Sequence, residues 1–241
     1  AFLDASAFFG DFGAIGGGAG AVSLPVSLSA TLETLHLRDG LELNKAELSF
    51  ESARSGVREV RASGEIESGG TLSASYFGPT KEAAARIDIE SDDAGFLMKA
   101  LLEQDFLSGG SLKLSGTLAR GDTPALLDLS LRDVRMRDAP FLTQVLSLAS
   151  LRGLADTLSG DGVLFTTIEV PVAIQSGRFV FEGARANGPA LGLTMNGWFE
   201  QESDELRLSG VLVPSFGMNS MLGGVPVIGD LFVGREGEGI F

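Results

Sequence analysis

The feature that most constrains the fold is an alternation of apolar and polar residues that recurs along most of the chain. Leu112 and Leu114 alternate with lysine and serine, and Leu206 and Leu208 alternate with arginine and serine. A period of two places apolar side chains on one face of a β-strand and polar ones on the other. About a dozen such segments follow one another at intervals of about ten residues, which is typical of all-β proteins. The sequence therefore predicts a mainly β fold whose antiparallel strands have one wet face.

The predicted strands are short and closely spaced. They cover 22–28, 35–37, 41–43, 46–50, 57–67, 70–77, 86–89, 112–118, 127–136, 163–165, 168–174, 179–181, 191–195, 198–199 and 206–213. Arg38-Asp39-Gly40 is a hairpin signal between two of them. A change of phase at Asn44-Lys45 predicts a turn or bulge there.

Two strand segments resemble each other and indicate how the sheet is built. Residues 109–116 read GGSLKLSG and residues 203–210 read SDELRLSG, with the same order of inward and outward side chains. The chain has no fixed-period repeat of the kind that defines a propeller or a leucine-rich solenoid. We therefore predict one extended, curled antiparallel sheet, a half-open groove that grows hairpin by hairpin rather than a closed compact barrel.

Two short helices are expected to interrupt the strands. Ser91-Asp92-Asp93 is a typical helix start, with carboxylates at the positive end of the helix dipole, and predicts a helix over 96–103. Asp138 followed by Pro140 predicts the N-cap and first turn of a second helix over 141–152. That helix would carry a broad apolar stripe and could plug or line one end of a groove.

The chain has an unusual segment at each end. Residues 1–21 are rich in glycine and phenylalanine and are expected to form an entry segment, followed by a single extended β domain over 22–241. Near the other end, 211–233 is almost entirely apolar, but its prolines and glycines argue against a membrane-spanning helix. We expect it to end the last strand as a compact apolar cap for a membrane or a partner. The predicted cap residues are Val213, Phe216, Met218, Met221, Leu222, Val225 and Ile228.

Charge and composition exclude several classes of protein. The chain has 241 residues, with 18 basic and 32 acidic side chains and a net charge of −14. Such an acidic protein repels nucleic-acid phosphates and anionic membrane surfaces, so a lipid contact would have to be apolar. The absence of cysteine rules out disulfides and thiolate chemistry. Without a signal peptide, and with both ends in apolar sequence, we expect the chain to be a fragment of a longer protein.

No constellation of residues suggests catalysis. His36 is the only histidine and is expected to be a solvated or rim residue, because a lone histidine without partners is seldom a site. No G-x-S-x-G elbow occurs. Two carboxylate clusters, at 88–93 and 200–205, are expected to be structural: the first marks a helix start and the second a hairpin turn. The alternative interpretation is a metal site or an acid/base pair. Trp198 and Tyr76 are expected to pack rather than bind a ligand. We predict no catalytic residue, no metal and no cofactor.

The remaining signal is the apolar face of the predicted sheet. Mean hydropathy is +0.23 although 21% of the residues are charged. A sheet this apolar must close on itself, pair with another layer or bind something apolar. An ordinary packed core explains the same pattern, and the two alternatives stay open at this point. The candidate groove residues are Leu112, Leu114, Leu129, Leu131, Phe165, Phe179, Phe181, Leu191, Leu193, Leu206 and Leu208.

Several motifs, in order, resemble a known family. They are SDDAG at 91–95, GGSL at 109–112, RDAP at 137–140, GPALG at 188–192, GVLVP at 210–214, Asn219 and GGVPVIG at 223–229. The chain resembles the C-terminal region of the AsmA-like proteins of Gram-negative bacteria, closest to the YhdP branch. The likeness covers most of 45–241 and is most specific in the last 55 residues.

The resemblance implies a fold and a function. It implies an N-terminal inner-membrane anchor outside this chain, a long curled β-sheet across the periplasm, and an apolar groove that carries phospholipid acyl chains toward the outer membrane. We expect a non-enzymatic lipid-handling module of the cell envelope, with membrane contact at its ends and a possible periplasmic or outer-membrane protein partner. The alternative is a scaffold that influences outer-membrane assembly without carrying lipid.

Overall fold

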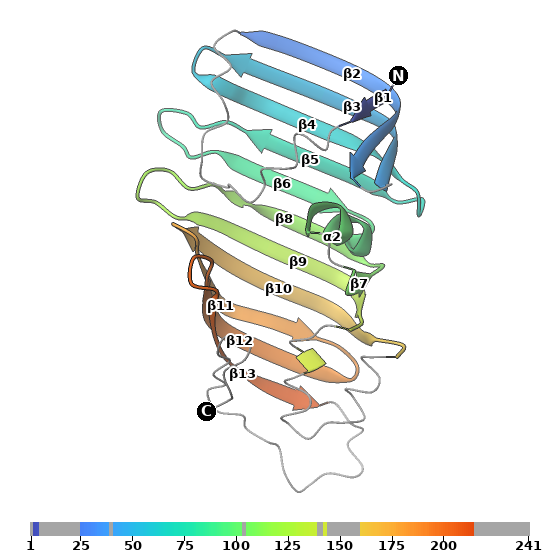
Figure 1. The fold of residues 1–241 in the computed structure, drawn as a ribbon, viewed down its shortest axis with the longest axis vertical. Helices are drawn as coiled ribbons and strands as arrows, with labels where there is room; N and C mark the ends of the chain where they lie inside the picture. The colour runs from blue at the N-terminus through green and yellow to red at the C-terminus, as the bar shows by residue number, and fades with distance from the viewer. Residues whose placement is uncertain are drawn as a thin grey trace, which may run out of the picture.

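The strands form one large sheet. The computed structural model describes residues 2–4, 25–38, 41–102, 105–138, 142–143 and 160–214 (Figure 1). These residues contain a 13-stranded sheet in the order β1-β2-β3-β4-β5-β6-β8-β9-β10-β11-β12-β13, with β7 paired to β9. The strands are β1 (Phe2–Asp4), β2 (Val26–Arg38), β3 (Leu41–Ala53), β4 (Gly56–Ile66), β5 (Thr71–Phe77), β6 (Arg86–Ser91), β7 (Leu107–Ser108), β8 (Ser111–Thr117), β9 (Ala125–Met136), β10 (Val163–Gln175), β11 (Arg178–Asn187), β12 (Leu191–Glu200) and β13 (Glu205–Pro214).

The predicted hairpin-by-hairpin architecture is confirmed. From β2 onward, each strand of the main order pairs antiparallel with the next, and the strands at the two ends of the order do not pair with each other. The sheet therefore stays open. β1 is the exception, because it pairs parallel with β2. It lies within the glycine-rich segment at 1–21, for which the sequence predicted no strand, and the rest of that segment lies outside the described residues.

Several predicted strands are parts of longer ones. Residues 26–28 of the segment at 22–28 and the segment at 35–37 fall in β2, those at 163–165 and 168–174 in β10, and those at 191–195 and 198–199 in β12. The alternation is interrupted at these places, but the backbone ladder continues through them, since Thr167 still pairs with Arg132 and Asn196 with Ser209. Side-chain pattern alone therefore divides strands that the hydrogen-bonded backbone joins.

Bulges keep the apolar side chains on one face. The change of phase predicted at Asn44-Lys45 is a bulge, because Lys45 has a φ of 50° and the β3–β4 register shifts there. In β9, Asp133 has a φ of 52°, and Leu131 and Val134 on either side of it are both buried in the same cluster. Each bulge restores the inward direction of the next apolar residue where strict alternation would turn it outward.

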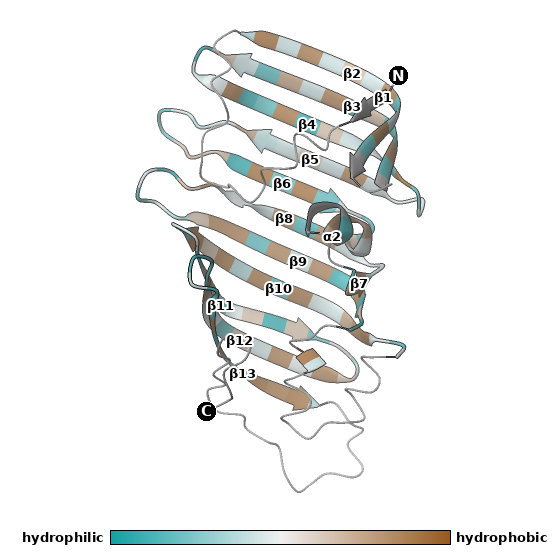
Figure 2. Ribbon diagram, viewed as in Figure 1, coloured by the Kyte–Doolittle hydropathy of each residue, from teal (hydrophilic) through white to brown (hydrophobic). Residues whose placement is uncertain are grey.

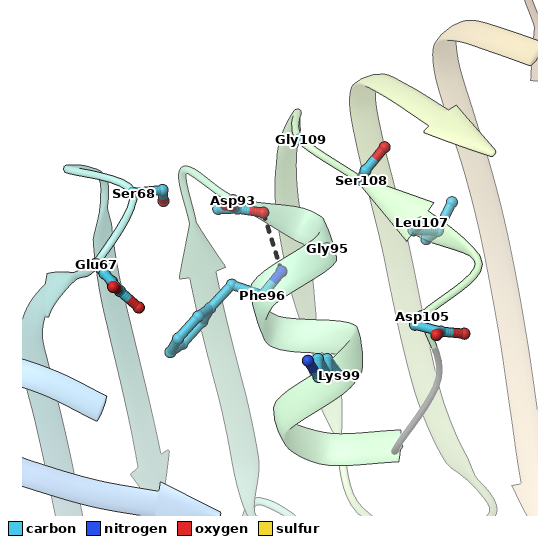
Figure 3. A pocket seen from close by; sticks show the side chains of 10 residues that line it. All are labelled: Glu67, Ser68, Asp93, Gly95, Phe96, Lys99, Asp105, Leu107, Ser108 and Gly109. Atoms are coloured by element: carbon cyan, nitrogen blue, oxygen red, sulfur yellow. Dashed lines mark hydrogen bonds between the residues drawn. The ribbon is translucent and has the colours of Figure 1, made fainter. Parts of the chain in front are cut away.

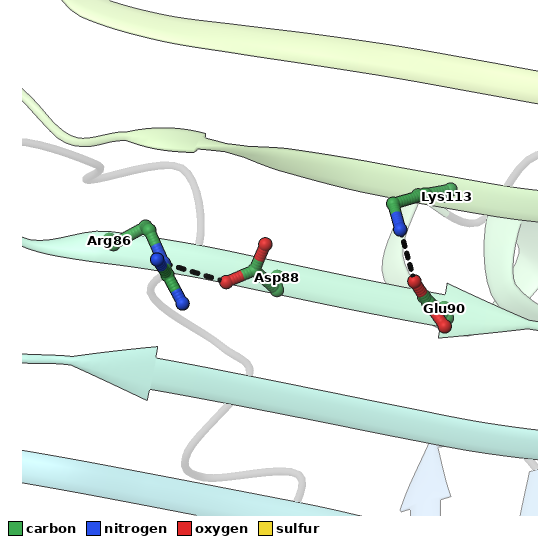
Figure 4. A network of polar contacts seen from close by, with 4 residues as sticks. All are labelled: Arg86, Asp88, Glu90 and Lys113. Atoms are coloured by element: carbon green, nitrogen blue, oxygen red, sulfur yellow. Dashed lines mark hydrogen bonds and ion pairs between the residues drawn. The ribbon is translucent and has the colours of Figure 1, made fainter.

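The opposite face of the sheet is polar and carries ion pairs both within and between strands. Figure 2 shows the resulting alternation of apolar and polar residues along the strands. Arg86 pairs with Asp88 along β6, and Lys113 of β8 pairs with Glu90 of β6 (Figure 4). The hydrogen bond and the charge of Glu90 raise the pKa of Lys113. These pairs are exposed, so they contribute little to the stability of the fold. They identify this face of the sheet as the one that contacts solvent.

One described helix covers part of the apolar face. The helix predicted over 96–103 is α2 (Ala94–Leu102), which begins two residues earlier than expected. Asp93 is its N-cap, because the amide of Phe96 donates to Asp93 Oδ1 at 2.9 Å. The helix contacts β7, β8 and β9 and lies in front of the sheet (Figure 1). Of the second predicted helix, only Leu142 and Thr143 are described, both helical, and Leu142 belongs to the core.

Candidate functional site: an apolar face with two halves

The predicted groove residues lie on a single face of the sheet, which we call the apolar face. Strand register carries this face across the molecule: Leu114 pairs with Ile89 on one side and Leu129 on the other, and Leu129 pairs with Val170. The same face continues through Phe181, opposite Val172, to the last strand. The alternation in sequence therefore correctly grouped side chains from six different strands.

Half of this face is a packed core. The half nearer α2, here the closed half, holds a cluster in which Leu112, Leu131, Phe165 and Leu191 are all at most 5% exposed. Ala94 and Leu97 of α2 pack into the same cluster, as does Leu107 of β7. Side chains this well covered present no surface to a ligand. For these four predicted groove residues, the structure shows the ordinary core that the sequence had left as the alternative.

Three predicted residues lie at the margin of the cluster. Leu114, Leu129 and Leu193 are partly buried and pack against it. They stand between the closed half and the remaining part of the face. Substitution at Leu129 would therefore disturb both the core margin and any neighbouring groove.

The rest of the face, which we call the open half, is covered unevenly: Ala125 and Leu127 of β9 are 1% and 9% exposed, whereas several other residues are less buried. Phe179, Phe181 and Leu206 are only partly buried and lie outside the core cluster, whereas Leu208, beside them, is 8% exposed. Phe179 contacts Phe199 with ring centres 5.9 Å apart. Further residues of this half were not among the predicted groove residues, although they share the phase of the alternation: Leu28, Phe50, Val60, Tyr76, Val172, Ile174 and Phe199. Of these, Leu28 is 59% exposed.

Tyr76 brings a hydroxyl into the open half. It pairs with Val60 and Ile87, and its partial burial raises the pKa of the phenol. Tyr76 therefore packs within a strand among apolar residues, as the sequence predicted. Its hydroxyl is a polar group to which an amphiphile on this half could hydrogen-bond.

Most of the predicted cap lies outside the described residues. Val213 is the only described member, and it pairs with Gly192 on the polar side of β13 with 46% of its surface exposed. Its neighbour Leu212 faces the apolar side and is 1% exposed. The remaining predicted cap residues, Phe216, Met218, Met221, Leu222, Val225 and Ile228, lie beyond Pro214, where the description ends.

A hollow among the described residues flanks the first turns of α2 (Figure 3). It has a volume of about 440 Å³ and contains Glu67, Asp93 and Asp105 together with Lys99. Asp93 is already engaged in capping α2, and Phe96 and Leu107 supply the apolar wall. The remaining lining residues are Ser68, Gly95, Ser108 and Gly109. This hollow lies at the covered end of the apolar face and does not extend into the open half.

The polar residues considered for chemistry have structural partners. His36 Nδ1 lies 3.0 Å from Glu42 Oε1 on the neighbouring strand. Asp92 Oδ2 accepts hydrogen bonds from the amide and the hydroxyl of Thr71, which lowers the pKa of Asp92. The second carboxylate cluster, at 200–205, surrounds the β12–β13 hairpin turn as interpreted from the sequence. Within the described ranges, no group of three or more His, Asp or Glu side chains is placed to hold a metal ion.

In the part of the chain that the structure describes, no helix is both long and apolar enough to cross a membrane. In comparisons with known proteins, no protein-family model, curated protein or solved structure matches the chain. The arrangement of the residues is therefore the basis for a functional proposal.

Proposed function

We propose that this protein is a lipid-handling module that holds phospholipid acyl chains on the open half of its apolar face. The observation that supports the proposal is the unequal coverage of one continuous face. α2 and the cluster beneath it cover the closed half, whereas Leu28, Phe179, Phe181 and Leu206 remain partly or largely exposed on the other. A core that needed only to be packed would not leave phenylalanine and leucine side chains this accessible on β2, β11 and β13.

The physical basis is differential solvation. Each methylene transferred from water to an apolar surface gains about 0.8 kcal/mol, so an acyl chain on the open half would be held without any specific hydrogen bond. The polar face, with its ion pairs within and between strands, would remain in water. A charge of −14 disfavours adsorption to an anionic membrane surface, which leaves apolar contact as the means of binding lipid.

The open, hairpin-ordered sheet also supports the AsmA-like resemblance. We propose on that basis that the chain is part of a periplasmic conduit between the inner and outer membranes, tethered to the inner membrane through a segment outside this chain. The sheet lets such a conduit lengthen by adding hairpins at an edge while the apolar face continues. A scaffold role in outer-membrane assembly is the alternative that the experiment below distinguishes.

The test is native mass spectrometry with lipid extraction on the protein purified from an expressing Gram-negative bacterium. Phe181→Glu, in the open half, is expected to leave the protein folded and to abolish co-purified phospholipid. Leu126→Glu is the matched control, because Leu126 is 53% exposed on the polar face and the same charge there should leave lipid bound. A folded wild-type protein without lipid would exclude the lipid-handling function and favour the scaffold role.

Leu112→Glu serves as the control for folding. Leu112 is 5% exposed in the core cluster, so an unpaired carboxylate there should unfold the protein. If Phe181→Glu unfolds as readily as Leu112→Glu, the open half is core and the proposal fails.

A further inference from the structure

Tyr76 is the only tyrosine of a chain that has 16 phenylalanines. It is the penultimate residue of β5, and its side chain lies on the open half between Val60 of β4 and Ile87 of β6. A phenylalanine would fill the space between two aliphatic side chains as well, because it differs from tyrosine only in lacking the hydroxyl. The feature that needs an explanation is therefore the hydroxyl of Tyr76.

In the part of the chain that the structure describes, no protein group forms a hydrogen bond with this hydroxyl. Val60 and Ile87 lie beside Tyr76 on the same face, with Ala62 and Ala74 in the next row, and none of these residues has a polar side chain. The phenol oxygen is not enclosed, so a ligand can reach it. A tyrosine hydroxyl in an apolar setting usually has a hydrogen-bond partner, and here the acceptor has to come from solvent or from a ligand.

The apolar surface that leads to Tyr76 is accessible. Strand register carries one row of this face from Leu28 through Phe50 and Val60 to Tyr76, across β2, β3, β4 and β5. Leu28 is 59% exposed, and the other members of the row are only partly buried. The main contacts of α2 are with β7, β8 and β9, away from this row. An acyl chain held on β2 to β5 would therefore lie within reach of the phenol.

Charge decides which kind of oxygen the phenol can meet. The residues that flank Tyr76 on the apolar face are uncharged, and Arg61 and Arg86 of the neighbouring strands contact Phe77 on the polar face instead. A phosphate or a carboxylate placed beside the phenol would lose hydration without gaining an opposite charge. The carbonyl oxygen of an ester is neutral, so it can accept a hydrogen bond there at a much smaller cost.

We infer that the hydroxyl of Tyr76 donates a hydrogen bond to an ester carbonyl of the bound lipid, so that the open half prefers acyl lipids to ether-linked lipids and to ionised fatty acids. This inference rests on the proposed function. Ester carbonyls lie where a lipid changes from apolar to polar, and Tyr76 combines an apolar ring and a polar tip in one side chain. A neutral hydrogen bond of this kind contributes about three- to tenfold in affinity.

The test compares a short-chain phosphatidylcholine with its diether analogue, which has the same chains and headgroup but no carbonyl. Tyr76→Phe is expected to weaken binding of the diacyl lipid about three- to tenfold and to leave the dissociation constant of the diether unchanged. Ser75→Ala is the matched control, because it removes a hydroxyl from the preceding residue of the same strand, opposite Arg61 and Asp88 on the polar face. It should change neither dissociation constant.

Three results would overturn the inference and leave the proposed function intact. An equal loss of both lipids in Tyr76→Phe would show that the side chain only packs. An unchanged affinity for the diacyl lipid would show that the hydroxyl is not used. Tighter binding of an ionised fatty acid than of its methyl ester, lost in Tyr76→Phe, would identify a carboxylate site. A wild-type protein that binds neither the diacyl lipid nor the diether would remove the proposed function as well.

A second measurement observes the phenol itself. Because Tyr76 is the only tyrosine, carbon-13 labelling of tyrosine at Cζ gives an NMR signal that belongs to this residue alone. Donation to a carbonyl should move the signal toward its position in an ionised phenol when the diacyl lipid is added, and the diether should move it less. Equal shifts with the two lipids would contradict the inference.

Discussion

The guanidinium group of Arg178 lies 4.3 Å from the centre of the Trp198 ring, and Arg207 on the other neighbouring strand lies 5.7 Å from it. The only tryptophan of the chain is thus held between two arginines on the polar face of β11, β12 and β13. Phe77 has the same arrangement, with Arg61 and Arg86 as its neighbours. Phe77 is the last residue of β5, and Trp198 lies two residues before the end of β12. We interpret these stacks as cross-strand supports of a wide, single-layered region of the sheet.

The Arg178–Trp198 stack should be measurable by a double-mutant cycle. Arg178→Ala is expected to lower the free energy of unfolding by about 0.5–1 kcal/mol in the wild type, because an exposed cation–π contact contributes about that much. In a Trp198→Ala background the same change should have little effect. Urea unfolding of the four proteins gives the coupling, and a coupling near zero would show that the stack is incidental.

The division of the apolar face predicts unequal costs for the same substitution. Phe165 is 1% exposed in the closed half, so Phe165→Ala should lower the free energy of unfolding by about 3–5 kcal/mol. Phe181 is only partly buried, and Phe181→Ala should cost less than half as much. Thermal or urea unfolding measures both. Equal costs would show that the two halves are packed alike.

Asp92 should make stability depend on pH at the acid end. The hydroxyl and the amide of Thr71 donate to Asp92 Oδ2 at 2.6 Å and 3.0 Å, and these bonds lower the pKa of Asp92 below its ordinary value of 3.8. A lowered pKa stabilises the fold above the unfolded-state pKa, and this contribution is lost as pH falls through the folded-state value.

Asp92→Asn should therefore be less stable than the wild type at neutral pH and approach it in acid, which urea midpoints at the two pH values would reveal. Thr71→Val is the intermediate case, because it removes the hydroxyl donor and keeps the amide. A stability difference that stays constant with pH would contradict this account.

Gly110 is expected to tolerate no side chain. Its φ is 67°, and a Cβ there would fall on the carbonyl oxygen of Arg132 in the neighbouring strand. Gly121 has a similar φ of 56° but open space around it, so Gly121→Ala measures the backbone strain alone, about 1–2 kcal/mol. Gly110→Ala should lower the free energy of unfolding by more than Gly121→Ala does. Equal losses in the two variants would show that the neighbouring strand moves to accommodate the new Cβ.

The sequence predicted the sheet and its apolar face because both depend on local alternation. Phe181 and Leu112 have the same pattern around them, and the prediction placed them correctly on one face. It did not distinguish the partly buried Phe181 from the covered Leu112, because the burial of Leu112 depends on where α2 docks. The parallel pairing of β1 has no local signal of this kind.

The hairpin order has a consequence for how the molecule comes apart. Apart from β1, β7 and α2, the main contacts of each strand are with the strands that precede and follow it in the sheet, so the array is close to one-dimensional. In such an array stability is approximately a sum of nearest-neighbour terms, and a defect at one strand can remain local. We expect unfolding to begin at a terminal hairpin and to proceed strand by strand. The strands that have not yet separated would keep their pairing and their apolar face.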